Sequence, residues 1–293
     1  MIIGARSGGS VIVIMVVIIL VAVGESHTKI ATHAKGAAST SGTVAATIPA
    51  SILHEVENVP PSLLNKAGIG GQPVTSSTGN NVLNRVEAVN GAPSVASAAV
   101  PAVDGKPQIF FLGAEFCPYC ATLRWSLIIA LSRFGTFAGL LPTASTSPDP
   151  VVQTFTFLHA TYSSPYVAFE PVEVDDQNRN PLQRPTAAEM RILGAWDNVE
   201  EVPWLDIAGR YIGDLAAWDD PVALVGLSRS AIAHSLSEAG TTIATNLDAA
   251  ANYITAGVCG VDSDQPASVC SSSGVIAAKA QLRKAPAATA LIG

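Results

Sequence analysis

The stretch 108–120, QIFFLGAEFCPYC, decides the fold, because it joins a buried strand to a closely spaced pair of cysteines. Residues 108–112 form a short, nearly continuous apolar run, which is typical of a strand that is buried on both faces. Pro118 stands where the first turn of a helix tolerates proline. Apolar residues then recur at helical spacing, and Gly135 is expected to end the helix. The sequence therefore predicts a strand, a turn and a helix, with the cysteines at the turn.

Cys117 and Cys120 have the spacing of a redox-active pair. A sulfur at a helix N-terminus lies beside unbonded N–H groups and the positive end of the helix dipole, and both lower the pKa of the thiol. Such an attacking sulfur should also be partly exposed. The second sulfur, one helical turn on, can attack a mixed disulfide and release the product. The spacing predicts Cys117 as the attacking thiol and Cys120 as the resolving thiol.

Two other interpretations of this pair compete with redox chemistry. Half of a zinc site would need a second ligand pair, but Cys259 and Cys270 are too far apart in sequence for a second knuckle. An inert disulfide across so short a loop would constrain little of the unfolded chain. The segment 176–180 begins like a calcium loop, but Pro181 stands where that loop requires Gly. Redox chemistry is the prediction, and no metal site is expected.

Two segments of the chain resemble the thioredoxin superfamily. The run 111–120 resembles the strand and active-site turn of that fold, with Glu115, Pro118 and Tyr119 in the turn. The run 202–207, VPWLDI, resembles its cis-proline strand, and the two segments follow in the right order. The whole pattern most closely resembles an uncharacterised family of membrane-anchored thioredoxin-like proteins, catalogued only as a domain of unknown function. The resemblance implies a thioredoxin-like α/β fold of three layers.

The same resemblance implies roles for residues around the cysteines. In the superfamily the peptide before the strand's proline is cis, and its backbone lies against the active-site sulfurs and pairs with the substrate chain. Val202 and Pro203 are therefore expected to position the substrate. One position departs from the pattern, because many thioredoxins keep a buried carboxylate six residues before the first cysteine and Phe111 stands there. The resemblance thus implies redox chemistry without assigning its direction or its proton relay.

The thioredoxin-like domain is expected over 106–293, with a helical insertion at 163–200 and a C-terminal tail that carries a disulfide. A second strand is expected at 154–159. Thr186 is expected to open a helix, because Thr186 and Glu189 have the spacing of a capping box. Later elements are a hairpin at 202–213 around Ala208-Gly209, a helix opening at Asp220-Pro221, and a last helix at 242–256 that ends at Gly257.

Cys259 and Cys270 suit a disulfide that closes a loop after the last helix. By the loop-entropy argument such a bond stabilises the fold by roughly 3 kcal/mol. The alternative is an auxiliary redox pair that exchanges with Cys117. Because Asp262 and Asp264 would disfavour a thiolate nearby, a structural disulfide is the prediction.

The N-terminus carries an uncharged apolar stretch at 10–24, SVIVIMVVIILVAVG. It predicts a single-pass membrane anchor after a short cytoplasmic N-terminus at 1–9. The small residues Ala22-Val23-Gly24 leave a cleaved signal peptide, and hence secretion, as the alternative. In both cases the rest of the chain lies outside the cytoplasm, with a flexible linker at 25–50 and an extension at 51–105 that packs on the main domain.

Composition narrows the function further. Hydrophobic residues make up 48% of the chain and charged residues 13%, so a buried core is expected. The net charge of -7 excludes nucleic acid as an expected partner, because phosphate binding requires clustered Lys and Arg. No dinucleotide or phosphate motif is present, so no cofactor is expected. The predicted function is a membrane-anchored, extracytoplasmic thiol-disulfide oxidoreductase acting on protein thiols or disulfides with a membrane electron donor or acceptor. A non-catalytic adhesion or scaffold module is the alternative.

Overall fold

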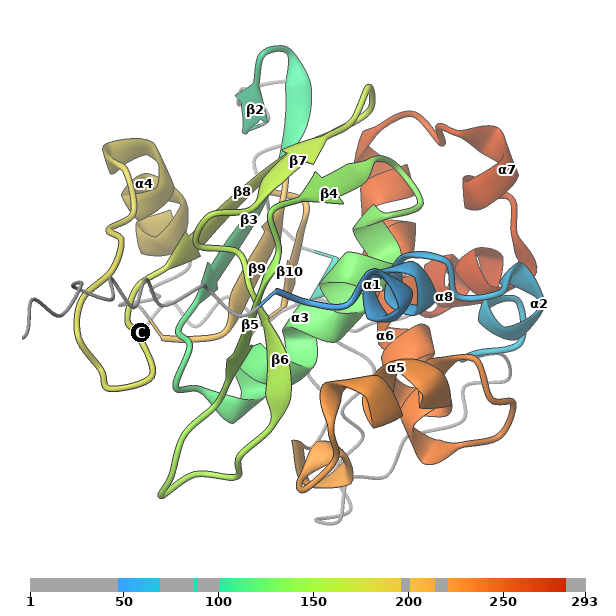
Figure 1. Ribbon diagram of the computed structural model, residues 1–293. Helices are drawn as coiled ribbons and strands as arrows, with labels where there is room; N and C mark the ends of the chain where they lie inside the picture. The colour runs from blue at the N-terminus through green and yellow to red at the C-terminus, as the bar shows by residue number, and fades with distance from the viewer. Residues whose placement is uncertain (1–46, 69–86, 89–100, 196–200, 214–220, 283–293) are drawn as a thin grey trace, which may run out of the picture. The chain divides into compact units, whose positions relative to one another are not determined.

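The strand predicted at 108–112 is β3 (Lys106–Gly113), at the centre of the main sheet of the computed structural model (Figure 1). The structure describes residues 47–68, 87–88, 101–195, 201–213 and 221–282. The predicted segments 1–9 and 10–24, and nearly all of the linker 25–50, lie outside these ranges. Among the helices within them, none is both long and apolar enough to cross a membrane.

β3 is paired on both sides, in opposite senses. β8 (Ala168–Glu173) runs parallel to it, whereas β9 (Trp204–Ile207) runs antiparallel along its other side. The remaining strands of this sheet extend from these three and are β10 (Tyr211–Gly213) beside β9, β1 (Glu87–Ala88) beside β10, and β2 (Ala102–Val103) in a hairpin with the start of β3. The fold is therefore mixed α/β.

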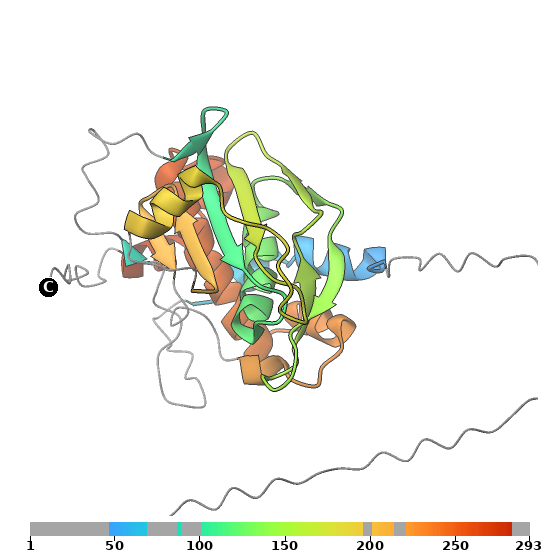
Figure 2. The same ribbon diagram turned by 90° about the vertical axis from the view of Figure 1, so that its left-hand side faces the viewer.

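Helices cover both faces of this sheet. α4 (Ala187–Ala195) lies on one face, and α3 (Pro118–Leu131) and α6 (Thr242–Val261) lie on the other (Figures 1 and 2). The side chains of β3 alternate accordingly. Ile109 and Phe111 belong to the hydrophobic cluster that contains α3 and α6, whereas Phe110 and Leu112 share a second cluster with Leu193 of α4. Because β3 is buried on both faces, its sequence is a continuous apolar run.

Two local predictions are confirmed by hydrogen bonds and backbone angles. The Thr186 N–H donates to the Glu189 carboxylate at 2.6 Å, and the Glu189 N–H donates to the Thr186 hydroxyl at 3.3 Å, which is the reciprocal pattern of a capping box. β9 and β10 pair around Ala208 and Gly209, whose φ values are 53° and 65°. Two positive φ values are what a tight hairpin turn between twisted strands requires.

The strand parallel to β3 comes later in the chain than the second predicted strand. The strand predicted at 154–159 corresponds to β6 (Gln153–Thr156), which pairs with β5 (Leu141–Ala144) and not with β3. Nearby, β4 (Thr136–Ala138) pairs with β7 (Thr161–Ser163). β8 falls inside the predicted insertion 163–200, yet it is a strand of the main sheet. Two glutamates and a proline in its sequence, AFEPVE, interrupt the apolar run that a buried parallel strand usually shows.

Two predicted boundaries of the later helices are wrong. The helix predicted from Asp220-Pro221 is only a 3-10 turn, η2 (Pro221–Leu224), and Asp220 itself lies outside the described residues. The longer helix, α5 (Arg229–Leu236), begins after Ser228, whose hydroxyl accepts a hydrogen bond from the Ala231 N–H. Gly257 does not end α6, which continues to Val261. The last turn of α6 contains Gly260, which allows the Tyr211 ring to pack closely, because a Cβ there would lie only 2.9 Å from the ring.

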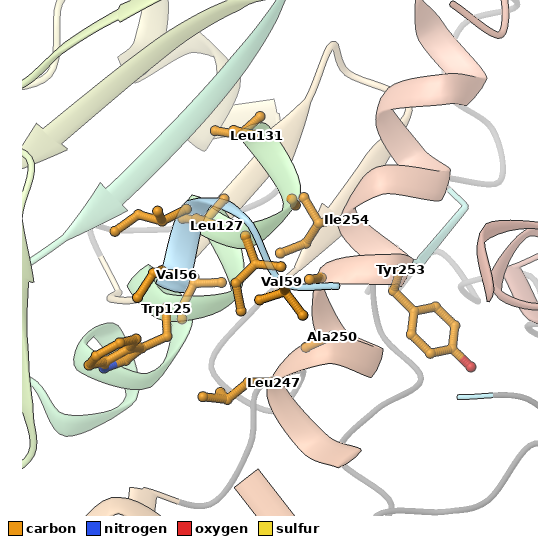
Figure 3. Packing of buried hydrophobic residues seen from close by; sticks show 14 of the residues in the cluster. Val56, Val59, Trp125, Leu127, Leu131, Leu247, Ala250, Tyr253 and Ile254 are labelled. Atoms are coloured by element: carbon orange, nitrogen blue, oxygen red, sulfur yellow. The ribbon is translucent and has the colours of Figure 1, made fainter. Parts of the chain in front are cut away.

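Two short helices before the main sheet share its larger core. α1 (Ala50–Glu57) and α2 (Pro61–Leu64) contribute buried apolar residues to the cluster of α3 and α6. Figure 3 shows Val56 and Val59 lying among side chains of α3 (Trp125 and Leu127) and of α6 (Leu247, Ala250 and Ile254). The Asn252 amide of α6 donates to the Leu64 and Ala67 carbonyls at 2.7 and 3.1 Å. The chain ends its described part with α7 (Ala267–Cys270) and α8 (Ser273–Leu282).

Candidate functional site

Cys117 is the N-cap residue of α3. Its backbone is extended, with φ -79° and ψ 123°, and its sulfur accepts a hydrogen bond from the Cys120 N–H at 3.2 Å. Pro118 begins the helix, where its missing N–H leaves no intrahelical bond unmade. The helix therefore starts where the sequence predicts. Its last residue is Leu131, four residues before the glycine that was expected to end it.

The two cysteines differ in exposure. Cys120 is fully buried, and Cys117 exposes 6% of its surface. An attacking thiol was expected to be more exposed than this. Both cysteines belong to a buried hydrophobic cluster, and five partly buried residues pack against it: Phe116, Tyr119, Ile192, Val202 and Ile212. Both cysteines are therefore buried, and Cys117 is the more exposed residue of the pair.

The two thiols also differ in acidity. The hydrogen bond with the Cys120 side chain lowers the pKa of Cys117 despite its burial, and the Cys120 N–H and the Arg124 charge act in the same direction. Burial raises the pKa of Cys120 well above its usual value, and the neighbouring Cys117 adds to this rise. One thiol is thus favoured as the thiolate while the other is held protonated. Attack requires a thiolate, so Cys117 is the better suited of the two thiols to act as a nucleophile.

The peptide Val202–Pro203 lies beside Cys117. It is cis, and the Cys117 thiol lies 3.9 Å from the Val202 carbonyl oxygen, toward which it can donate. Pro203 is buried, and the next residue, Trp204, is paired with Leu112 of β3. The structure therefore brings the two residues expected to position the substrate to the sulfur expected to attack it.

A buried ion pair that the sequence analysis did not identify lies next to the cysteines. Arg124 Nε donates to Glu173 Oε1 at 2.9 Å and Arg124 Nη2 to Glu173 Oε2 at 2.5 Å, and both side chains are fully buried. Nη2 also donates to the carbonyl oxygen of Ala114, in the active-site turn, at 2.9 Å. One signal could have revealed this pair: Arg124 is the single charged residue of α3, PYCATLRWSLIIAL. Charged side chains are almost never fully buried unless they are paired.

Comparison with known proteins gives one match. Residues 95–195 match the family described as "Domain of unknown function (DUF929)". This agrees with the resemblance to an uncharacterised domain family. No curated protein matches the chain, and no solved structure does. The range matched by DUF929 contains the cysteine pair and the Arg124–Glu173 ion pair, and it ends before Val202 and Pro203.

Within the DUF929 range, β5 and the segment after β8 hold the turn that precedes α3. The Glu115 N–H donates to the Asp175 carbonyl at 2.9 Å, and the Glu115 carboxylate accepts a hydrogen bond from the Thr143 hydroxyl at 3.3 Å. The Arg179 guanidinium lies 3.7 Å from the centre of the Phe116 ring. Hydrogen bonds within the segment 176–180 close it into a loop. The backbone N–H and the side-chain amide of Asn180 both donate to the Asp176 carboxylate. Glu115 therefore contributes to the shape of the turn through these contacts.

The predicted disulfide between Cys259 and Cys270 is present, and it lies apart from the DUF929 range. Its sulfurs belong to residues that are 1% and 4% exposed, and they join the cluster of α3 and α6, whereas Cys117 and Cys120 join the cluster on the α4 side. A cavity of about 300 Å³ borders Cys259 and is lined by residues of α6, α8 and β10. The disulfide thus ties α7 to the end of α6.

Proposed function

We propose that this protein is a thiol-disulfide oxidoreductase whose redox pair is Cys117 and Cys120. The observation that carries the proposal is the asymmetry of the two thiols at the start of α3. Cys117 caps the helix, keeps 6% of its surface exposed and has a lowered pKa, whereas Cys120 is fully buried and has a raised pKa. An attacking and a resolving thiol require this division of properties.

The arrangement of the main sheet supports a thioredoxin-like fold for the region. In space the strands run β8, β3, β9, β10, with β8 parallel to β3 and the last two antiparallel to their neighbours. α3 follows β3, α4 lies between β8 and β9 in sequence, and α6 follows β10. The first and last of these helices share one face and α4 takes the other, which gives three layers (Figure 2). β4 to β7 are then the elements inserted after α3.

In the reducing direction, the Cys117 thiolate attacks one sulfur of a substrate disulfide. A bond forms between Cys117 Sγ and that sulfur, and the other substrate sulfur leaves as a thiolate. Cys120 then loses its proton and attacks Cys117 Sγ, which displaces the second substrate thiolate and leaves Cys117–Cys120 oxidised. Two electrons pass from the pair to the substrate, and oxidation of a substrate dithiol is the same sequence in reverse. The backbone at Val202 holds the substrate chain beside Cys117.

The proposal places this chemistry outside the cytoplasm, on protein thiols or disulfides. The Cys259–Cys270 bond supports this, because structural disulfides persist mainly in oxidising compartments. The apolar stretch 10–24 would hold the domain at the membrane, where a membrane protein would donate or accept the electrons. If that stretch is a cleaved signal instead, the domain is secreted.

A redox titration of the full chain tests the proposal. The protein is equilibrated in buffers of graded ratios of reduced to oxidised glutathione, quenched with acid and alkylated, and each cysteine is read by mass spectrometry. We expect Cys117 and Cys120 to convert together in a two-electron transition while Cys259–Cys270 stays oxidised.

One observation favours a second candidate, a non-catalytic scaffold module with structural disulfides, namely the 6% exposure of Cys117. In that case the Cys117–Cys120 pair would fail to interconvert, or its potential would lie below about -300 mV, where the glutathione pool leaves structural disulfides oxidised. Either result would contradict the oxidoreductase.

A further inference from the structure

One face of α3 carries the two cysteines and the only charge of the helix. Cys117 caps the helix, Cys120 follows three residues later, and Arg124 follows after four more, so the three side chains lie along one stripe. Arg124 and Cys120 are both fully buried. Water therefore cannot screen the guanidinium charge from the sulfurs as it would at the surface.

Ala114 connects the guanidinium to the buried sulfur. Its carbonyl oxygen accepts from Arg124 Nη2 at 2.9 Å, and its N–H lies 3.5 Å from Cys120 Sγ and donates to it. The charge is thus held at a fixed place relative to the redox pair by a single residue of the active-site turn. Arg124 Nη1, by contrast, is buried and has no hydrogen-bond partner within the described part of the chain. A buried donor left unpaired is costly, and such donors concentrate where a function needs them.

The Glu173 carboxylate is bonded away from the turn that holds the cysteines. Its carboxylate receives two hydrogen bonds from the guanidinium and a third from the Phe157 N–H at 3.1 Å, on β6's side of the site. The positive end of the pair is therefore the end bonded to the active-site turn. Other charged residues also contact the turn. Glu115 is bonded to Thr143, and its N–H donates to the Asp175 carbonyl. Arg179 stacks on Phe116 and pairs with Asp149.

We infer that Arg124 is the positioning residue that sets the redox direction of the pair, by holding a buried positive charge next to the sulfurs and so favouring their reduced, thiolate-bearing form. A pair whose reduced form is stabilised is an oxidant. The Arg124 charge therefore shifts the domain toward oxidising substrate dithiols. This inference rests on the proposed function and adds the direction that the Cys-x-x-Cys spacing leaves open. The Arg124 charge also contributes to the lowered pKa of Cys117, and it offsets part of the rise that burial causes in the pKa of Cys120.

The oxidising step balances without a further reactant. A substrate thiolate attacks Cys117 Sγ of the Cys117–Cys120 disulfide, forms a mixed disulfide with it and displaces Cys120 as a thiolate beside Arg124. The second substrate thiolate then attacks the substrate sulfur of the mixed disulfide and displaces the Cys117 thiolate. The substrate loses two electrons and becomes a disulfide, the pair gains two electrons, and Cys120 takes up a proton from solvent. A disulfide such as oxidised glutathione can return the pair to its oxidised form.

Two variants of the full chain separate charge from packing. Arg124→Met with Glu173→Met removes both charges together, which avoids an unpaired buried carboxylate. Arg124→Lys keeps the positive charge and serves as the matched control. For each protein we would measure the equilibrium constant of the Cys117–Cys120 pair with glutathione and the pH at which the alkylation rate of reduced Cys117 is half-maximal.

In the double-methionine variant we expect the equilibrium to shift at least tenfold toward the oxidised pair, or about 30 mV toward a more reducing potential. The half-maximal pH of Cys117 alkylation should rise. For Arg124→Lys, the same equilibrium constant should stay within about threefold of the value for the unmodified protein. In free energy, a threefold change is less than half of a tenfold change.

The outcomes distinguish this inference from the proposed function. If the unmodified pair does not exchange with glutathione, the proposed function fails. If it exchanges, but the double-methionine variant leaves the equilibrium and the alkylation profile unchanged, or Arg124→Lys shifts both as far as the double variant does, the role of the Arg124 charge is overturned and the oxidoreductase stands.

Discussion

Replacing Asp248 with Asn is expected to stabilise the protein at pH 8 by about 3–5 kcal/mol. Asp248 lies on α6 and is 1% exposed, and neither of its carboxylate oxygens has a hydrogen-bond partner among the residues that the structure describes. Burial raises its pKa to about 8 from the ordinary value of 3.8. The folded state therefore prefers the protonated acid, while the unfolded chain ionises freely. An amide of the same shape carries no charge to desolvate, so the substitution removes this cost.

The sign of the pH dependence follows from the raised pKa. Below about pH 4 the carboxyl is protonated in both states and costs nothing. As the pH rises from 4 to 8 the unfolded state gains stability by ionising, so the stability of the folded protein falls, and above pH 8 the difference levels off. The unmodified protein and Asp248→Asn should therefore be equally stable near pH 4 and diverge as the pH rises.

Urea denaturation from pH 4 to pH 9 measures this divergence. Asp206→Asn is the graded comparison, because burial raises the pKa of Asp206 to about 6 and its gain should level off above that pH. The Asn at 206 can still accept the hydrogen bond that the Gly209 N–H donates to Asp206 at 2.9 Å. A gain at position 248 that does not change with pH, or a loss at pH 8, would show that Asp248 is ionised in the folded protein.

Arg124→Ala is expected to destabilise the protein by about 3–5 kcal/mol, whereas Arg124→Met with Glu173→Met should change its stability by only about 1 kcal/mol or less. The single substitution leaves the Glu173 carboxylate buried with the Phe157 N–H as its remaining partner among the described hydrogen bonds. The double substitution replaces the ion pair with apolar groups of similar volume, which removes the cost of desolvating both charges.

Urea denaturation at pH 7 compares the three proteins, with circular dichroism to show that each is folded. Equal losses in the single and double variants would mean that the ion pair supports the fold through the shape of its side chains rather than through compensation of charge. The double variant also has to fold for the redox comparison above, so this measurement comes first.

The site could be predicted from sequence where it depends on neighbours along the chain. The start of α3 at Pro118, the capping box at Thr186 and Glu189, and the tight turn at Ala208-Gly209 each follow from local backbone rules. The Cys259–Cys270 disulfide could also be predicted, because the spacing of these two cysteines suits a structural bond and that of Cys117 and Cys120 does not. Such features need no knowledge of the rest of the fold.

What could not be predicted depends on contacts between distant segments. Glu173 is separated from Arg124 by 49 residues and meets it because β8 pairs with β3, with Glu173 in register with Gly113. The polar residues of β8 concealed that pairing, since a paired charge can be buried in a strand that reads as exposed. The same pairing supplies a buried carboxylate near the site although Phe111 stands where thioredoxins carry theirs. In this protein that carboxylate is bonded to Arg124.

The central claim, that Cys117 attacks and Cys120 resolves, is tested most directly by trapping the mixed disulfide. The reduced full-length Cys120→Ser protein is mixed with oxidised glutathione, and Cys117→Ser is the matched control. Cys120→Ser should keep a stable glutathione adduct on Cys117, because nothing is left to resolve it, whereas Cys117→Ser should form little adduct on the fully buried Cys120. An adduct on Cys120 as fast as on Cys117, or none on Cys117 while the protein remains folded, would contradict the account.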